Sequence, residues 1–144
     1  MQFEYNDGGR LEYFKGEKAE DCVARSISIV TGLPYIDVYK RLAEGNATQR
    51  GGGKRSARNG ISTKRKWFRD YMTELGFVWT PTMKIGSGCT THLRADELPK
   101  GKLVVSVTRH MTAVINGVIH DTHNPSRNGT RCVYGYWTFE KEDA

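Results

Sequence analysis

The first third of the chain contains apolar residues at helical spacing. Val23, Ile27 and Val30 recur at i, i+4 and i+7, which is the spacing of one buried helix face. Asp21 precedes this stretch and is a preferred N-cap residue, because its carboxylate can accept the free amide groups of the first turn. Gly32 follows the stretch and is a typical helix stop. The pattern therefore predicts a helix that begins directly after Asp21 and ends at Gly32.

Two more helices are predicted farther along the chain. One begins with Pro34, which suits the first helical position, and runs to Gly45. The other begins at residue 62 or 63 and ends at Gly76. Its buried face is a stripe of Trp67, Phe68, Tyr71 and Leu75. Residues 45–62 lie between the two helices and predict a basic, glycine-rich loop.

The second half of the chain predicts strands. Short apolar runs separated by turn residues lie at 77–80, 102–108, 111–115, 118–122 and 131–139. Residues 1–20 are polar and aromatic with glycine breaks, and predict a loop or a short hairpin. Helices first and strands afterwards are typical of an α+β domain. We expect one domain over residues 1–144, with N-terminal helices packed on a C-terminal antiparallel sheet.

The composition excludes several classes of protein. With 38% hydrophobic and 26% charged residues, 16 glycines and 4 prolines, the chain is neither collagen-like, low-complexity nor a coiled coil. Its longest apolar runs are only a few residues, so no membrane span is expected. Residues 1–7 lack the basic-then-apolar pattern of a secretory leader. We therefore expect a soluble, cytoplasmic protein with no membrane partner.

The formal net charge of +6 comes from one segment. Residues 50–69 contain eight basic and no acidic residues, and the rest of the chain contains 14 basic and 16 acidic residues. Lys54, Arg55 and Arg58 are therefore candidates for binding an anionic partner, either a nucleic acid or an acidic protein. Trp67 could stack on bases, but it also suits the core stripe. The segment could equally cover a cleft or form a solvated loop.

One of the three cysteines has a setting that favours reactivity. Cys22 lies in the first turn of a predicted helix, where the helix dipole favours the thiolate. Cys89 and Cys132 have no such setting, and in a cytoplasmic protein all three thiols are expected to be reduced. Cys89 and His92 provide only half of a zinc site. We therefore predict no metal and no cofactor.

A predicted hairpin brings a histidine and an aspartate together. Asn116-Gly117 between two apolar runs is a strong signal for a two-residue type I′ turn. The turn fixes three opposed pairs: Ile115 with Val118, Thr112 with Asp121, and His110 with His123. His110 and Asp121 then become diagonal neighbours on one face, a span that imidazole and carboxylate can bridge. His120 points to the opposite face.

Cys22, His110 and Asp121 are therefore a candidate catalytic triad. Cys22 would attack a carbonyl carbon, His110 would act first as base and then as acid, and Asp121 would orient the imidazole. Each residue also has a structural alternative. Cys22 could be a buried structural cysteine, His110 a hydrogen-bonded histidine in a strand, and Asp121 a capping residue near the turn. His123 shares their face, and is either a substrate contact or a plain surface residue.

Two segments resemble a known family. Asp21-Cys22-Val23-Ala24-Arg25-Ser26-Ile27 opens a helix, and the segment from His110 to Asp121 forms a histidine-led hairpin. Together they resemble small bacterial and phage papain-fold cysteine peptidases related to the bacteriocin-processing C39 peptidases. The resemblance implies a papain-like α+β fold and cleavage of a protein or peptide substrate. Peptidoglycan endopeptidases of the NlpC/P60 type fit less well, because they place small residues such as Ser-Gly after the cysteine.

The sequence departs from this family at the oxyanion hole. Such peptidases place a glutamine about half a dozen residues before the cysteine, where this chain has Lys15, Gly16 and Glu17. Losing one oxyanion donor costs about 100- to 1000-fold in rate. The backbone amide of Cys22, together with Asn6, could substitute.

Other activities share the same three residues. A peptidase, a deamidase and an acyl or transglutaminase-type transferase all use such a triad. The competing hypothesis is a catalytically weak or inactive papain-fold binding protein that uses the basic loop on a nucleic acid or an acidic protein.

Overall fold

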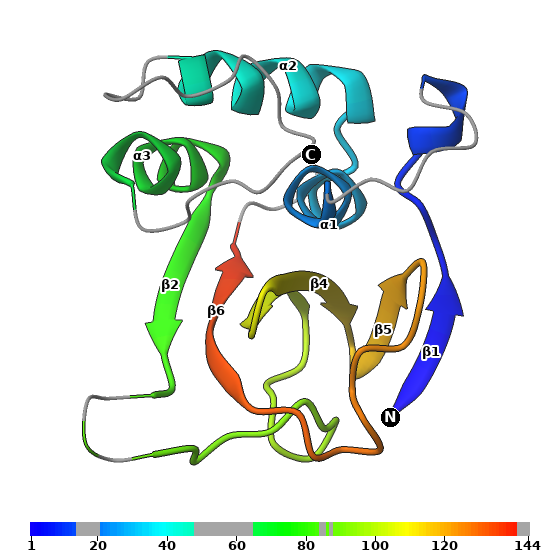
Figure 1. Cartoon of the computed structure of the whole chain (residues 1–144), viewed down its shortest axis with the longest axis vertical. Helices are drawn as coiled ribbons and strands as arrows, with labels where there is room; N and C mark the ends of the chain where they lie inside the picture. The colour runs from blue at the N-terminus through cyan, green and yellow to red at the C-terminus, as the bar shows by residue number, and fades with distance from the viewer. Residues whose placement is uncertain (14–20, 48–64, 84–85, 87, 141–144) are drawn as a thin grey trace.

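The computed structural model describes residues 1–13, 21–47, 65–83, 86 and 88–140. In these residues three helices cover one side of a six-stranded sheet (Figure 1). The helices are α1 (Cys22–Thr31), α2 (Tyr35–Ala47) and α3 (Lys66–Leu75), and a short 3-10 turn covers Arg10–Glu12. The strands are β1 (Gln2–Tyr5), β2 (Phe77–Pro81), β3 (Lys102–Val107), β4 (His110–Ile115), β5 (Val118–Asp121) and β6 (Val133–Phe139). The predicted α+β class is confirmed.

Strands β2 to β6 pair antiparallel, as predicted for the C-terminal sheet, but the whole sheet is mixed because it also contains the N-terminal strand β1. Its strand order is β1-β5-β4-β3-β6-β2, and β1 pairs parallel to β5 with Gln2 beside Val118 and Tyr5 beside Asp121. The prediction of a loop or hairpin over residues 1–20 also missed β1. All four side chains of this edge strand are exposed, so they do not show the apolar alternation that marks a strand in sequence.

The helix boundaries follow the predictions at α1 and differ at α2. Asp21 and Gly32 flank α1 as expected, with Gly32 at a φ of 76°. Helix α2 continues past Gly45, so the prediction that it ends at this residue was wrong. An added Cβ at Gly45 would overlap the indole ring of Trp67, so this glycine permits close approach of α2 and α3. The predicted start of the third helix at 62 or 63, and residues 48–62 of the predicted loop, lie outside the described residues.

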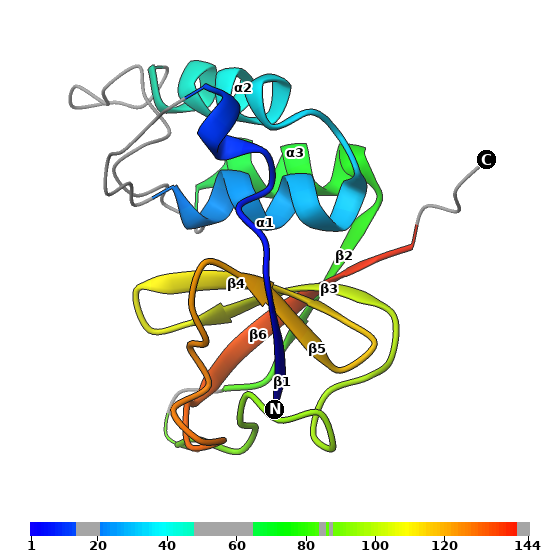
Figure 2. The same cartoon turned by 90° about the vertical axis from the view of Figure 1, so that its right-hand side faces the viewer.

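The sheet has an apolar layer on each side. Residues of the three helices pack on one face, and residues 88–101, before β3, cross the other (Figure 2). Phe68 and Tyr71 of the predicted stripe are buried in the first layer, against Trp137. Leu93 and Leu98 are buried in the second. No helix in the described residues is long and apolar enough to cross a bilayer.

A disulfide joins Cys89 to Cys132, so the expectation of three reduced thiols was wrong. The Cα atoms of the two residues are 5.9 Å apart. Backbone hydrogen bonds bring the two segments together: Leu93 N–H donates to Arg131 O at 2.8 Å, and Val133 N–H donates to Thr91 O at 2.8 Å. The two cysteines are 43 residues apart in sequence, so no local pattern predicts their pairing. Cys22 is the free cysteine.

Candidate active site

The thiol of Cys22 lies against the start of β4. Cys22 is the first residue of α1, and the backbone N–H of Met111 points to its Sγ at 3.4 Å. Helix α1 packs across β4 through Val23, Ala24 and Ile27, which are buried in the same apolar layer as Met111 and Ala113. This packing places the N-terminus of α1, with its free amide groups, beside the histidine that begins β4.

The hairpin has the predicted turn and register. Asn116 and Gly117 both have positive φ, at 49° and 81°, as a type I′ turn requires. Ile115 pairs with Val118 as predicted, and the ladder continues in the same register through Val114 with Ile119 to Ala113 with His120. The other two predicted pairs, Thr112 with Asp121 and His110 with His123, lie beyond the end of this ladder. His110 Nε2 nevertheless lies 2.7 Å from Asp121 Oδ2.

Asp121 is buried, with hydrogen-bond donors at both carboxylate oxygens. Oδ2 accepts from the Thr112 hydroxyl at 2.7 Å as well as from His110, and Oδ1 accepts from Thr122 N–H at 2.7 Å. Burial alone would raise the pKa of Asp121, but hydrogen bonds from His110, Thr112 and Thr122 bring this pKa below its ordinary value. The aspartate is therefore a charged acceptor with a fixed orientation.

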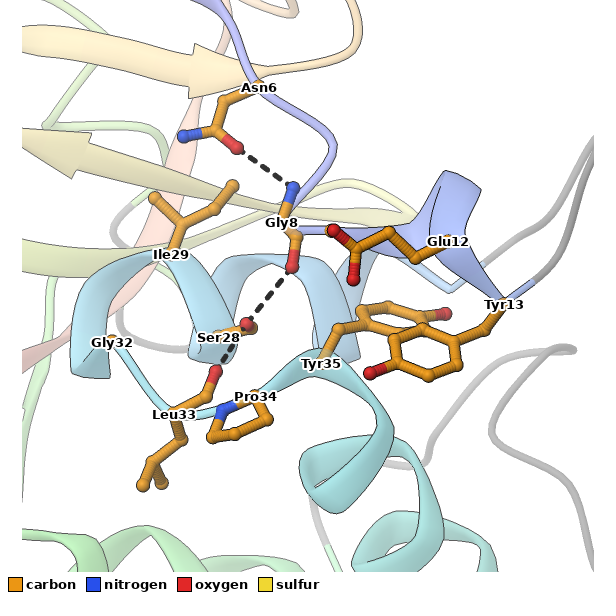
Figure 3. Close-up of a pocket in the computed structure, with 11 residues that line it drawn as sticks. Asn6, Gly8, Glu12, Tyr13, Ser28, Ile29, Gly32, Leu33, Pro34 and Tyr35 are labelled. Carbon is orange, nitrogen blue, oxygen red and sulfur yellow. Dashed lines mark hydrogen bonds between the residues drawn. The ribbon is translucent and has the colours of Figure 1, made fainter.

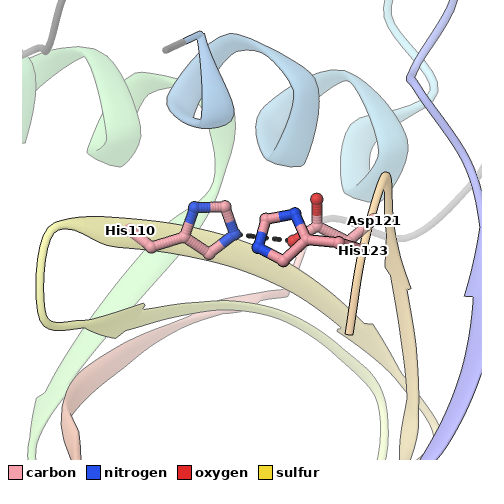
Figure 4. Close-up of side chains that lie close together, drawn as sticks. All are labelled: His110, Asp121 and His123. Atoms are coloured by element: carbon pink, nitrogen blue, oxygen red, sulfur yellow. Dashed lines mark hydrogen bonds and ion pairs between the residues drawn. The ribbon is translucent and has the colours of Figure 1, made fainter. Parts of the chain in front are cut away.

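His110 lies between Asp121 and Cys22. Burial acts to lower its pKa, but hydrogen bonds and opposite charge from Asp121 and Cys22 outweigh this and raise the pKa to about 9. Because Nε2 faces Asp121, Nδ1 is the nitrogen left for the thiol, and in Figure 4 it points toward the first turn of α1. The structure thus brings together the three predicted residues, from α1, β4 and β5.

The residue before the cysteine does not act as the predicted side-chain cap. The Asp21 carboxylate makes no capping hydrogen bond to α1. It is buried among cations instead, with Arg25 Nη1 at 2.7 Å and Arg10 Nε at 3.1 Å, and it also accepts the hydroxyl of Tyr35. Burial, followed by the contact with Asp21, raises the pKa of Tyr35. Two guanidinium groups and a phenol compete successfully with the amides of the first turn for this carboxylate.

Arg25 connects this buried cluster to the triad. Its Nη2 lies 3.7 Å from Asp121 Oδ1, while its Nη1 contacts Asp21. Sequence reasoning missed Arg10, Arg25 and Tyr35. The i, i+4 spacing of Asp21 and Arg25 is a signal that could have suggested their ion pair. The contacts of Arg10 and Tyr35 depend on tertiary packing, which no local spacing encodes.

His123 lies on the same face as the triad, as the register predicted. Its ring centroid is 4.9 Å from that of His110, with 47° between the ring planes. His123 is exposed, and partial burial lowers its pKa. His120 lies in a different environment, with Nδ1 3.7 Å from a carboxylate oxygen of Glu4 on the edge strand.

The structure does not bring the Asn6 side chain to Cys22. Asn6 Oδ1 accepts the Gly8 N–H at 2.8 Å. Its side chain lines a pocket of about 330 Å³ beside Ser28 and Ile29, in the C-terminal half of α1, whereas Cys22 begins that helix (Figure 3). Among the described residues, the Cys22 backbone amide remains the oxyanion donor that the sequence suggested. Residues 15–17 lie outside the described part.

The remaining candidate residues are three basic residues and the pair Cys89 and His92. Lys54, Arg55 and Arg58 lie outside the described residues. Cys89 Sγ lies 3.7 Å from His92 Nε2, and His92 Nδ1 lies 3.2 Å from Glu97. Within the described ranges, the group of side chains close enough to share a metal ion is His110, Asp121 and His123, and Cys89 and His92 are not part of it.

Comparisons with protein families, with curated proteins and with solved structures find no match to this chain.

Proposed function

We propose that this protein is a papain-like cysteine peptidase or a related thiol hydrolase that cleaves an amide bond through Cys22, His110 and Asp121. The observation that carries the proposal is the position of His110. One nitrogen lies 2.7 Å from a buried aspartate, and the imidazole also interacts with a thiol at a helix N-terminus. This is the thiol–imidazole–carboxylate arrangement of nucleophilic catalysis. The order of the residues, and the helix and hairpin that carry them, support membership of the C39-like group.

The first half of the reaction forms a thioester. His110 Nδ1 takes the proton of Cys22, and Sγ forms a bond to the carbonyl carbon of the substrate. The carbonyl oxygen becomes an oxyanion, which the Cys22 backbone N–H can stabilise at the start of α1. When the tetrahedral intermediate collapses, the carbon–nitrogen bond breaks and His110 gives its proton to the leaving amine. Asp121 fixes the ring orientation throughout.

The second half releases the product. His110 accepts a proton from water, whose oxygen attacks the thioester carbon, and the carbon–sulfur bond breaks to return the thiol. An ammonia leaving group would make the enzyme a deamidase, and an amine in place of water would make it a transferase. The substrate is a protein or peptide, and the site requires no cofactor.

A peptide vinyl sulfone tests this function. The probe bonds covalently to an activated thiol, and the adduct is detected by intact mass and located by peptide mapping. We expect one adduct per chain, at Cys22, in the full-length protein with its disulfide intact. Cys22→Ser should abolish it, and His110→Ala should reduce it to the level of a simple thiol. Equal adduct formation by wild type and His110→Ala would contradict the proposal.

The position of Asn6 favours a second candidate function. Because Asn6 Oδ1 accepts the Gly8 N–H and the side chain lines the pocket beside Ser28, only the Cys22 backbone amide remains of the two suggested oxyanion donors. The alternative is a papain-fold binding protein that uses Lys54, Arg55 and Arg58 on a nucleic acid or an acidic protein. Replacing these three residues by Gln should then flatten the salt dependence of polyanion affinity. An unchanged slope would show that the basic segment does not bind the polyanion.

A further inference from the structure

The triad leaves one neighbouring side chain without a role. His123 comes just after β5, and its ring lies beside that of His110, although no step of thiol catalysis needs a second imidazole. The ligand atoms of His110, Asp121 and His123 all lie within 4.8 Å of one another (Figure 4). Two imidazole nitrogens and one carboxylate oxygen are donors that borderline divalent metal ions prefer.

We propose that His110, Asp121 and His123 form a binding site for a divalent transition-metal cation such as Zn²⁺. Binding of the cation does not depend on the proposed function. Its effect on the thiol, described below, does rest on that function.

The surroundings of Asp121 suit coordination through one oxygen. Oδ1 accepts Thr122 N–H and lies 3.7 Å from Arg25, so it already has its own partners. Oδ2 is the oxygen that faces His110, and the Thr112 hydroxyl donates to it at 2.7 Å. Such a hydrogen bond orients a metal-binding carboxylate. The aspartate can therefore supply one oxygen in a fixed direction.

The distances require only a small rearrangement. Bonds of about 2.0–2.2 Å to Zn²⁺ place tetrahedral ligand atoms roughly 3.4 Å apart. The His110 Nε2–Asp121 Oδ2 pair, now at 2.7 Å, would have to open by less than about 1 Å. His123 would have to move closer, and it is an exposed residue beyond the end of β5, so its ring can turn without disturbing the sheet. Its exposure also leaves the cation a path from solvent.

Metal binding would prevent His110 from acting as a base. The cation takes the place of the Nε2 proton that is shared with Asp121, and this proton moves by way of solvent to Nδ1, so that the ring stays neutral. Nδ1 faces α1 and now carries a proton, so it can donate a hydrogen bond but cannot accept the proton of Cys22. The cation would therefore inhibit the thiol chemistry reversibly.

Isothermal titration of the full-length, metal-free protein with Zn²⁺ tests the site. Work in a Cys22→Ser background excludes direct binding to the thiol. We expect one Zn²⁺ per chain. Loss of an outer-shell partner alone weakens metal affinity by about 10- to 100-fold, so loss of a ligand in His123→Ala should cost at least about 100-fold. His92→Ala is the matched control, since it removes a histidine that is not part of this group of three side chains, and it should leave the affinity unchanged.

Other results would overturn the inference. In the Cys22→Ser background, no binding at millimolar Zn²⁺, equal affinity with and without His123→Ala, or loss of affinity in His92→Ala would each do so. His123→Asn, with folding checked by circular dichroism, separates ligand loss from misfolding, and it should also lose the site.

A second readout separates this inference from the proposed function. Zn²⁺ should slow alkylation of Cys22 in the wild type, and EDTA should restore it, whereas His123→Ala should show no zinc effect. His123-dependent zinc binding beside an unreactive Cys22 would support the metal site and refute the thiol function. A reactive Cys22 without His123-dependent zinc binding would support the thiol function and refute the metal site.

Discussion

The guanidinium of Arg25 lies 3.7 Å from the carboxylate of Asp121. Arg25 is on α1, one turn beyond Cys22, and Asp121 ends β5. The same guanidinium contacts Asp21 at 2.7 Å, immediately before α1. One buried cation therefore joins the helix that carries the thiol to the strand that carries the orienting carboxylate.

Replacing this cation should destabilise the protein strongly. Arg25→Met leaves two buried carboxylates without a shared partner, and breaking a buried pair in this way costs about 3–5 kcal/mol. Lys66→Met is the matched control, because it removes an exposed ion pair to Asp70 and should cost less than about 1 kcal/mol. Chemical denaturation at pH 7 measures both. Similar losses in the two variants would contradict a structural role for the Arg25 contacts.

The pKa values of the two histidines of the site should be shifted in opposite directions from the ordinary value of 6.5. Contacts with Asp121 and Cys22 raise the pKa of His110 to about 9, whereas burial lowers the pKa of His123. Side-chain NMR titration in EDTA should therefore show His123 losing its proton first. Asp121→Asn should move the His110 midpoint to lower pH. A pKa of His110 that is lower than the pKa of His123 would contradict this prediction.

The raised pKa of His110 also predicts how stability depends on pH. The folded state binds this proton more tightly than the unfolded state, so the contribution is complete below about 6.5 and is lost as pH rises toward about 9. The difference in unfolding free energy between wild type and His110→Gln should shrink over that range. Denaturation at pH 6, 7.5 and 9.5 measures it. A difference that grows with pH would show that the sign is wrong.

Gly45 should resist replacement even though it lies in a helix. On helix propensity alone, Gly45→Ala would stabilise the protein by about 0.5–1 kcal/mol. The added Cβ would overlap the Trp67 ring, so we expect a net loss of about 1–3 kcal/mol. Glu44→Ala, at an exposed position of the same helix, should change stability by less than about 0.5 kcal/mol. Stabilisation by Gly45→Ala would show that the two helices do not approach so closely.

The parts of the site that were predictable depend on local signals. Asn116-Gly117 allows positive φ at two successive positions, and this fixes the register of the hairpin. In that register His110 and Asp121 are diagonal neighbours whose side chains meet. The apolar spacing after Asp21 likewise places Cys22 at the start of a helix. In both cases a few adjacent residues determine the backbone, so the sequence alone is sufficient.

The parts that were missed depend on contacts between distant residues. Strand β1 has exposed side chains and owes its conformation to pairing with β5. Cys89 meets Cys132 because their two segments form a tertiary bridge. Gly45 is a typical helix stop in isolation, but it lies within α2, where it faces the ring of Trp67. In each case the partner that decides the outcome is far away in sequence.

Alkylation of Cys22 by iodoacetamide at pH 6, in EDTA and with the disulfide intact, tests the central claim most directly. An ordinary thiol is largely protonated at this pH and reacts slowly. The account predicts that Cys22 in the folded chain reacts at least about tenfold faster than in the unfolded chain, and that His110→Ala removes this difference. Cys22 reacting no faster in the folded chain, or equally fast in His110→Ala, would contradict a thiol activated by His110.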